Sequence, residues 1–453
     1  MRALISLASS QEEAARVAEH LEPTEGWELH VVSRAKIRPP SSGQAYRFHR
    51  ADHPLAQALT LAGSFEAAWI MRPEARPTAG AIPAIDLWLS ERDAEALYGD
   101  TMGPGGLPLP RPRLGRMRMA SSGDIGSSII LTQDASRTLA NDVELSGDLD
   151  LAWYRLALAV ADMRTEHLPV EIEVTRSLPG IDPAARAREL YPADPQAVRI
   201  GDEPCLLPFP APATSSASII IPSIGSPASF GDTTRPALLA CLESLGPTHL
   251  REIIIVAGPA MPASVVEEAR RLSPIEPTVV HIDGPFNFSA SCNLGAAHAT
   301  GDILLFLNDD VEALSPDWIE PIIGLAERPE IGAVGARLLF PDGTIQHAGV
   351  TVMPTIGEPA HLDYRKHPDS APLHSRAVSE VLAVTGACLA LTADDFAEVG
   401  GWCEDLPVNF NDIDLCLKLV QLGRTNVSCN PVTLIHREST SRDGSVAQEE
   451  IDA

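Results

Sequence analysis

The feature that most constrains the fold of this chain is a regular alternation of strand and helix patterns that begins near residue 218. The predicted strands are 218–222, 252–256, 278–282 and 302–307, and the predicted helices between them are 235–245, 262–272 and 289–299. Strands that alternate with helices in this rhythm form a mainly parallel sheet with helices on both faces. The second half is therefore expected to be a Rossmann-like α/β domain, with ligands bound beyond the carboxyl ends of its strands.

The first 202 residues repeat this plan in a weaker form. Strand patterns occur at 4–7, 27–32 and 67–71, and a helical pattern occurs at 10–21. The segment 203–217, EPCLLPFPAPATSSA, is rich in Pro, Ala and Ser and lacks apolar periodicity, so we expect a linker there. The chain is thus predicted to contain two tandem domains, 1–202 and 218–445, with the linker between them.

Composition excludes several classes of protein. The chain has 453 residues, enough for two or three domains, and a formal net charge of -27. This acidic balance argues against nucleic acid as a partner, because nucleic-acid binding needs a basic face. The sequence contains no run of about 18 apolar residues, so no membrane span is expected. The N-terminus has the pattern of a strand and a helix, not of a signal peptide.

Cysteine usage points to a reducing compartment. The seven cysteines are odd in number and none forms a CxxC pair. We therefore expect a cytoplasmic protein with neither a disulfide framework nor a zinc site.

Two adjacent acids follow the predicted strand 302–307, in the stretch FLNDDVE. Acids in such a turn can cap a helix, solvate the turn or hold a cation. The turn Asn308-Asp309-Asp310 lies at the carboxyl end of a strand in a predicted parallel sheet, where ligands gather. That position favours the cation.

Two further polar features follow in the second half, NFNDIDLCLK at 409–418 and LIHRES at 434–439. The acids of the first could simply favour the N-terminus of a helix. The histidine of the second could be structural. Taken singly, neither feature defines a function.

The order and context of these features add a resemblance. The stretches GPFNFSASCNLGAAHATGDILLFLNDD, IGAVGARLLFPDGTIQHAGV, TGACLALTADDFAEVGGW, FNDIDLCLKL and HREST occur in that order. Together they resemble the inverting family-two glycosyltransferases with the GT-A fold, particularly the bacterial rhamnosyltransferase-like enzymes of surface polysaccharide assembly. The resemblance covers roughly 218–442 and implies two tandem GT-A-like domains, the first degenerate because Arg72-Pro73-Glu74 stands where the second has Asn308-Asp309-Asp310.

The resemblance implies a divalent cation, Mg²⁺ or Mn²⁺. Asp310 would be a ligand, His436 would complete the metal sphere, and Asp309 would lie nearer the sugar or ribose. Hard oxygen ligands suit a cation that bridges the phosphates of a nucleotide sugar. Ser439 and Arg442 follow on a segment that could close over the diphosphate, where an Arg fork fits phosphate oxygens.

By the same resemblance Asp412 is the catalytic base. An acceptor hydroxyl is a poor nucleophile until a positioned carboxylate takes its proton. Single displacement then inverts the anomeric centre. Asp414, two residues further on, would cap the helix or orient the base.

Four other positions are candidate substrate contacts. Pro222 and Ser223 end the first strand of the second domain, where the family's backbone meets the nucleotide; a plain turn is the alternative. Asn293 matches a helix that faces the donor, although amides there also act as struts. Trp402 could stack on the acceptor or pack in the core. One departure concerns the nucleotide base, because Ala257 stands where relatives have an aspartate that grips it.

These expectations combine into one function. The second domain would be a metal-dependent inverting glycosyltransferase that moves a sugar, with rhamnose as the best single guess, from a nucleotide diphosphate to a glycan or polyprenyl-linked saccharide. Any membrane contact would be peripheral, at the inner face of the plasma membrane. The first domain would be a scaffold, an acceptor platform or a homodimer surface. The alternatives are a non-catalytic nucleotide- or glycan-binding pseudoglycosyltransferase and, less favoured, a nucleotidylyltransferase.

Overall fold

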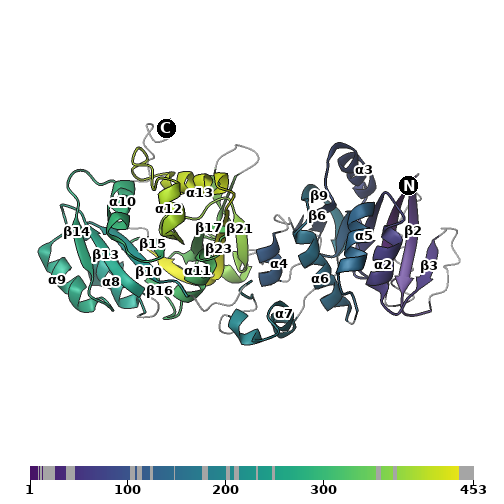
Figure 1. The fold of residues 1–453 in the computed structure, drawn as a ribbon, viewed down its shortest axis with the longest axis horizontal. Helices are drawn as coiled ribbons and strands as arrows, with labels where there is room; N and C mark the ends of the chain where they lie inside the picture. Colours follow the sequence, from purple (N-terminus) through teal and green to yellow (C-terminus); the bar gives the residue numbers. More distant parts are fainter. Residues whose placement is uncertain are drawn as a thin grey trace. The chain divides into compact units, whose positions relative to one another are not determined.

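The structure is a computed structural model of the chain. It divides into two compact units, Met1–Glu189 and Leu190–Ala453 (Figure 1). The residues it describes are 1–8, 10, 13, 26–36, 46–102, 108–109, 115–122, 126–146, 148–175, 182–199, 205–208, 214–230, 233–246, 250–352, 359–370 and 375–437. The helix predicted over 10–21 lies outside this set, apart from Ser10 and Glu13. The domain limits predicted from composition remain a prediction.

The second unit is built on one large sheet. In spatial order its strands are β14 (Thr278–His281), β13 (Leu250–Ala257), β10 (Ala217–Ser223), β15 (Ile303–Leu307), β22 (Cys388–Thr392), β17 (Ile331–Leu339), β23 (Thr425–His436) and β16 (Val311–Ala313). Two further strands join this sheet, β18 (Ile345–His347) on β17 and β21 (Val378–Val381) on β23. Two hairpins stand apart from it, β11 (Pro227–Phe230) with β12 (Thr233–Pro236), and β19 (Val350–Val352) with β20 (Pro359–His361).

The four strands predicted from the sequence form the parallel part of this sheet. β10 pairs in parallel with β13 and β15, and β13 with β14. Every residue of β15, ILLFL, is buried, as expected for a parallel strand covered on both faces. Beyond β15 the sheet becomes mixed, because β22 runs antiparallel to both β15 and β17. The expected α/β class is confirmed, with an antiparallel extension that the strand pattern did not predict.

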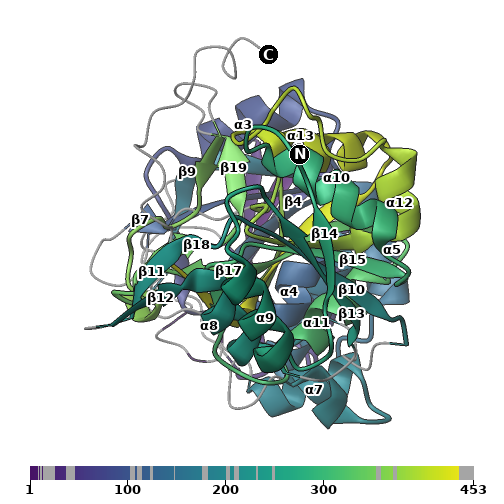
Figure 2. The ribbon, with the colours of Figure 1, turned by 90° about the vertical axis from the view of Figure 1, so that its left-hand side faces the viewer.

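Helices cover both faces of this sheet. They are α8 (Ala237–Ser244), α9 (Ala263–Leu272), α10 (Phe288–His298), α11 (Ile319–Ala326), α12 (Ala393–Glu398) and α13 (Asn411–Gln421), with a 3₁₀ turn η3 (Pro368–Ser370). In Figure 1, α10 lies on one side of β10 and β13, and α8 and α9 lie on the other. In Figure 2, β10, β13 and β15 lie to the right of α9. In the part of the chain that the structure describes, no helix is long and apolar enough to cross a membrane.

The first unit has a sheet of its own. Its strands in spatial order are β3 (Arg47–Arg50), β2 (Trp27–Ser33), β1 (Arg2–Leu7), β4 (Ala67–Met71), β8 (Ser128–Thr132), β6 (Ala96–Met102), β9 (Thr165–Thr175) and β5 (Ala75–Pro77), with β7 (Pro108–Leu109) on β6. Its helices are α2 (Pro54–Ala62), α3 (Ala81–Glu91), α4 (Arg116–Ser122), α5 (Gln133–Asp142), α6 (Leu149–Ala161) and α7 (Pro183–Leu190), and a 3₁₀ turn η2 (Pro195–Val198) follows.

The two sheets share one topology. The spatial order β3-β2-β1-β4-β8-β6-β9-β5 of the first matches β14-β13-β10-β15-β22-β17-β23-β16 of the second, strand for strand. The sense of pairing agrees too, since β4–β8 and β15–β22 are antiparallel whereas β6–β9 and β17–β23 are parallel. Matched strands also occur in the same order along the chain. The expected pair of GT-A-like domains is confirmed at the level of fold.

An aromatic cluster fills the core beside α10 and α12. Trp402 is only 2% exposed, and its ring meets Phe306 and Phe288 edge to face, with centroids 5.1 and 5.6 Å away. Phe396 packs on Phe306 from α12. Such edge-to-face pairs stabilise the fold beyond what the burial of their apolar surface contributes. Trp402 is therefore a core residue that joins β15 to α10.

We expect Trp402→Ala to destabilise the second unit by about 3–5 kcal/mol, the usual cost of truncating a buried aromatic side chain. Urea denaturation followed by circular dichroism measures this as a lower free energy of unfolding in the transition of the second unit. Trp88→Ala, in the first unit, should leave the same transition in place. A fully stable Trp402→Ala second unit would contradict the core assignment.

Candidate functional site

The two acids that follow β15 lie in a three-residue turn between β15 and β16. The Asn308 amide donates to the Ala387 carbonyl over 3.0 Å, and the Val311 amide closes the turn onto the Asn308 carbonyl over 3.3 Å. Asp309 and Asp310 are thus held at the carboxyl end of β15, the edge where a sheet of this type binds its ligands.

His436, the last residue of β23, meets Asp310 across this edge. β23 pairs with β16 so that His436 lies opposite Val311, and its Nε2 is 3.0 Å from Asp310 Oδ1. Both side chains are largely buried, with exposed fractions of 13% for His436 and 5% for Asp310. The sequence placed these two residues 126 positions apart; the sheet brings them into contact.

The hydrogen bonds around His436 define which of its nitrogens carries a proton. Nδ1 is 2.6 Å from the amide oxygen of Gln346, which only accepts, so Nδ1 is the donor. The Asn308 side-chain amide donates to Nε2 over 3.2 Å. Nε2 is also 3.0 Å from Asp310 Oδ1, within reach of a shared proton or of a shared cation.

This pair fits a divalent cation. Two ligands at right angles in an octahedral sphere, each about 2.1 Å from the ion, are about 3.0 Å apart, the separation of Asp310 and His436. Among the described residues no group of three or more His, Cys, Asp or Glu side chains could hold a metal. Such an ion would therefore take its remaining ligands from substrate oxygens and water, as Mg²⁺ commonly does.

Asp309 has a different environment from its neighbour. The hydroxyl of Ser223, at the end of β10, donates to Asp309 Oδ2 over 2.5 Å. Burial, and after it the charge of Asp310, raise the pKa of Asp309 to about 7. A bound cation would oppose both effects, so protonation of Asp309 and cation binding are expected to compete.

Asp412 is the second residue of α13 and lies on the same edge. Its Oδ2 accepts the Gly386 amide over 3.0 Å and its Oδ1 accepts the Ile413 amide over 2.8 Å, which fixes the carboxylate. Gly386 precedes Ala387, whose carbonyl accepts from Asn308. Consecutive residues thus connect the proposed base to the acidic turn, and the structure brings the two predicted acid features together.

The remaining predicted contacts are Pro222, Ser223, Asp414 and Asn293. Pro222 and Ser223 end β10 in buried positions beside the acidic turn. Asp414 is ion-paired to Lys418 one helical turn on, at 2.7 Å. Asn293 is a strut, because its amide both accepts from the Trp402 amide and donates to the Trp402 carbonyl.

The remaining expectations about the substrate site concern Trp402, the residues 439 and 442, and the nucleotide base. The buried ring of Trp402 is not presented to an acceptor in this structure. Ser439 and Arg442 lie outside the described residues. Ala257 is buried at the end of β13, opposite Ser223, so no carboxylate is available there for a nucleotide base.

Sequence reasoning missed one aromatic beside the proposed base. Phe410, which precedes α13, has a left-handed backbone with φ of 61° and is 39% exposed. A left-handed aromatic residue is strained, and such strain gathers at functional sites. The sequence NFND carries no signal of this conformation.

The roles of Gln346 and of the contacts around Arg437 were also not predicted from the sequence. Arg437 pairs with Glu312 of β16, donates to the Ser229 carbonyl over 3.1 Å and lies over the Phe230 ring at 4.2 Å. Its amide donates to the Asp310 carbonyl. Arg437 thus ties the β11–β12 hairpin to the acidic turn.

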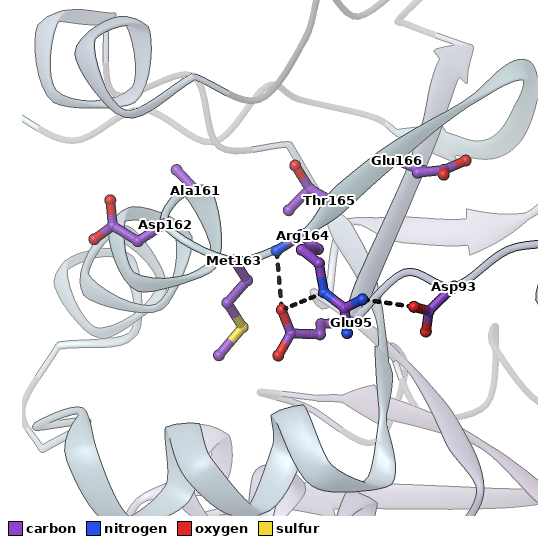
Figure 3. A pocket seen from close by; sticks show the side chains of 8 residues that line it. All are labelled: Asp93, Glu95, Ala161, Asp162, Met163, Arg164, Thr165 and Glu166. Carbon is purple, nitrogen blue, oxygen red and sulfur yellow. Dashed lines mark hydrogen bonds and ion pairs between the residues drawn. The ribbon is translucent and has the colours of Figure 1, made fainter. Parts of the chain in front are cut away.

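A recess of about 480 Å³ in the first unit is a separate feature (Figure 3). It lies at the amino ends of β6 and β9, where Arg164 pairs with Asp93 at 2.6 Å and with Glu95 at 3.4 Å. Ligands of such sheets bind at the carboxyl ends instead. The recess is therefore not a candidate active site.

The second unit thus combines a GT-A-like fold with acids at the carboxyl edge of its sheet. Residues 218–374 match the family model "Glycosyl transferase family 2". The match includes Asp309 and Asp310 but ends before Asp412.

Two curated proteins match part of the chain. The O-antigen biosynthesis protein RfbC of Myxococcus xanthus is 35% identical over 241 residues, which is 52% of this chain and 18% of that protein. The uncharacterized protein y4gI of Sinorhizobium fredii is 42% identical over 160 residues, which is 35% of this chain and 18% of that protein. The matched region is thus less than one fifth of either relative.

Solved structures also align with the chain at low identity. GalNAc-T7 with UDP, GalNAc and Mn²⁺ aligns over 52% of this chain and 47% of that chain, with a TM-score of 0.40 and 14% identity. The mannosyltransferase PcManGT from Pyrobaculum calidifontis, in complex with GDP-Man and Mn²⁺, aligns over 50% and 58%, with a TM-score of 0.34 and 14% identity.

The contact between Gln346 and His436 leads to one prediction. Gln346→Leu removes the acceptor that holds the proton on Nδ1, so the affinity for Mn²⁺ should fall about 10–100-fold, the usual effect of losing an outer-shell partner. Titration calorimetry with Mn²⁺ and a nucleoside diphosphate measures it. Gln421→Leu, at the exposed end of α13, is the matched control. Unchanged Mn²⁺ affinity in Gln346→Leu would contradict this tautomer argument.

The raised pKa of Asp309 predicts how stability depends on pH in the absence of metal. Between its ordinary value of 3.8 and about 7, the folded chain holds a proton that the unfolded chain has released. The stability from this group therefore falls as pH rises through that window. At pH 8, Asp309→Asn should be more stable than the wild type, on the order of 1–3 kcal/mol.

At pH 4 this advantage should disappear. Urea denaturation in chelator at both pH values tests it, with the exposed Asp283→Asn as control. An equal difference between wild type and Asp309→Asn at pH 4 and pH 8 would contradict the assignment.

Proposed function

We propose that the second unit is an inverting, metal-dependent glycosyltransferase that transfers a sugar from a nucleotide diphosphate to a hydroxyl of a growing glycan. The observation that carries the proposal is the 3.0 Å approach of Asp310 and His436 at the edge of the sheet where Asp412 is also fixed. The family match of residues 218–374 supports the class of reaction.

The acidic edge is suited to the leaving group. Asp310 and His436 would hold Mg²⁺ or Mn²⁺, and the cation would supply charge neutralisation to the departing diphosphate. Asp309, held by Ser223, would orient the sugar or ribose of the donor. Ser439 and Arg442 would close over the diphosphate.

Asp412 would act on the acceptor. Its carboxylate takes the proton of the acceptor hydroxyl while that oxygen bonds to the anomeric carbon and the bond to the diphosphate breaks. Attack opposite the leaving group inverts the anomeric centre. A general base of this kind contributes about 10²–10⁴ in rate. The backbone amides of Gly386 and Ile413 hold the carboxylate in one orientation.

Donor and acceptor are proposed more coarsely. Because Ala257 offers no acid, the nucleotide base must be recognised by other groups, and rhamnose remains the best single guess for the sugar. The likeness to a protein named for O-antigen biosynthesis supports a glycan or polyprenyl-linked saccharide as acceptor. We further propose that Phe410, exposed beside Asp412, gives the acceptor sugar the aromatic surface that buried Trp402 cannot.

The compartment and assembly follow from this proposal. A polyprenyl-linked acceptor would place the protein in the cytoplasm, with peripheral contact at the inner face of the plasma membrane. The first unit would serve as a scaffold, an acceptor platform or a dimer surface.

The deciding experiment compares Asp412→Asn with Asp414→Asn. Asp412→Asn should reduce transfer about 10²–10⁴-fold, because the base is lost, while donor binding persists. Asp414→Asn, which removes only the ion pair with Lys418, should retain most activity. The measurements are single-turnover transfer and calorimetry with the donor chosen from a thermal-shift panel.

The outcome also separates the rival function. A non-catalytic nucleotide-binding protein would bind nucleoside diphosphates yet show no transfer in the wild type. If a nucleoside diphosphate binds as tightly in chelator as in Mn²⁺, the roles of Asp310 and His436 are wrong.

A further inference from the structure

The first unit contains a counterpart of the acidic turn. Its turn 72–74 links β4 to β5 with three residues, as 308–310 links β15 to β16. The Arg72 amide donates to the Ser127 carbonyl over 2.8 Å, matching the bond from Asn308 to Ala387. The pairs Met71–Ser128 and Leu307–Cys388 confirm the register. Arg72 therefore stands at the place of Asn308 and Glu74 at the place of Asp310.

The other two positions of the site also have counterparts. Thr175 lies opposite Ala75 on β5, as His436 lies opposite Val311 on β16. Asp150 is the second residue of α6, as Asp412 is of α13, and each helix is followed after three residues by a corresponding strand. The first unit thus keeps both acids and has lost the imidazole.

The guanidinium of Arg72 joins these two acids. Its Nε contacts the Glu74 carboxylate and its Nη2 contacts the Asp150 carboxylate. The Arg72 side chain is only 6% exposed, and it lies 5.7 Å from the ring centroid of Trp153. Arginine stays charged at all working pH values and is suited to buried ion pairs.

We propose that Arg72 is a built-in cation that takes the place of the divalent ion in the first unit. This proposal rests on the roles proposed for Asp310 and Asp412. In the second unit, the donor and the cation would share the space between these two acids. In the first unit, the Arg72 side chain takes the corresponding space. The first unit then takes up neither a divalent cation nor a nucleoside diphosphate. Each chain has one catalytic centre.

The charges nearby support this assignment over an anion site. Arg72 already meets two carboxylates, and Glu173, fully buried nearby on β9, accepts from Thr101 and from the Ser127 amide. Of the four charged side chains placed here, Glu74, Asp150 and Glu173 are acids and only Arg72 is basic. A diphosphate would meet net repulsion there.

The test uses the full chain and hydrogen exchange followed by mass spectrometry. In Arg72→Met, exchange in 72–77 and in the first turn of α6 should rise about tenfold or more, because two acids lose their shared partner. Arg72→Met/Glu74→Gln/Asp150→Asn should return exchange toward the wild-type rate. Arg116→Met, which breaks the exposed pair with Asp162, is the control. Unchanged exchange in Arg72→Met would overturn the proposal.

A second measurement addresses the metal directly. Electron paramagnetic resonance of free Mn²⁺, with UDP, GDP or dTDP present, should show uptake by the wild type and none by Asp310→Asn. Uptake that persists in Asp310→Asn and is lost on adding Glu74→Gln would overturn the proposal. If the wild type itself takes up no Mn²⁺, the proposed function fails instead, while the exchange result still decides the role of Arg72.

Discussion

The site depends on one contact, in which the imidazole Nε2 of His436 and the carboxylate of Asp310 lie 3.0 Å apart. Gln346 and Asn308 hold the two nitrogens of the imidazole. In a region of low dielectric the carboxylate needs a positive charge nearby, which a protonated ring or a bound cation would supply. The backbone holds both groups in place through the pairing of β16 with β23. The fold therefore presents a preorganised pair of potential metal ligands at the edge of the sheet.

The rest of the second unit positions the other functional side chains around that contact. The acidic turn bonds to Ala387 and Asp412 bonds to Gly386, so two consecutive residues of one backbone segment hold both. A departing diphosphate and an arriving hydroxyl require opposite treatment, neutralisation for one and proton removal for the other. β22 lies between β15 and β17, so this segment is anchored in the sheet. Preorganisation here comes from main-chain hydrogen bonds and not from mobile side chains.

Much of this arrangement was accessible from the sequence, and the exceptions have physical causes. The parallel strands were predicted because β-branched runs alternate with helices, and the motif order placed Asp310, Asp412 and His436 in one family pattern. The antiparallel strands 331–339 and 388–392 were not predicted, because their pairing depends on contacts distant in sequence. The burial of Trp402 and the left-handed Phe410 depend on tertiary packing, which the local pattern does not encode.

The two units illustrate two solutions to one electrostatic problem. Acids at the carboxyl edge of a sheet need a positive charge, supplied either by a soluble ion or by a side chain. A soluble ion can bind with the donor and leave with the diphosphate, so the site is renewed at each turnover. The guanidinium of Arg72 is tethered, cannot be released and fills the space between its acids. On the roles proposed for Asp310 and Arg72, the tethered cation would stabilise the fold at the expense of turnover, and a strand topology used twice would yield one catalytic centre.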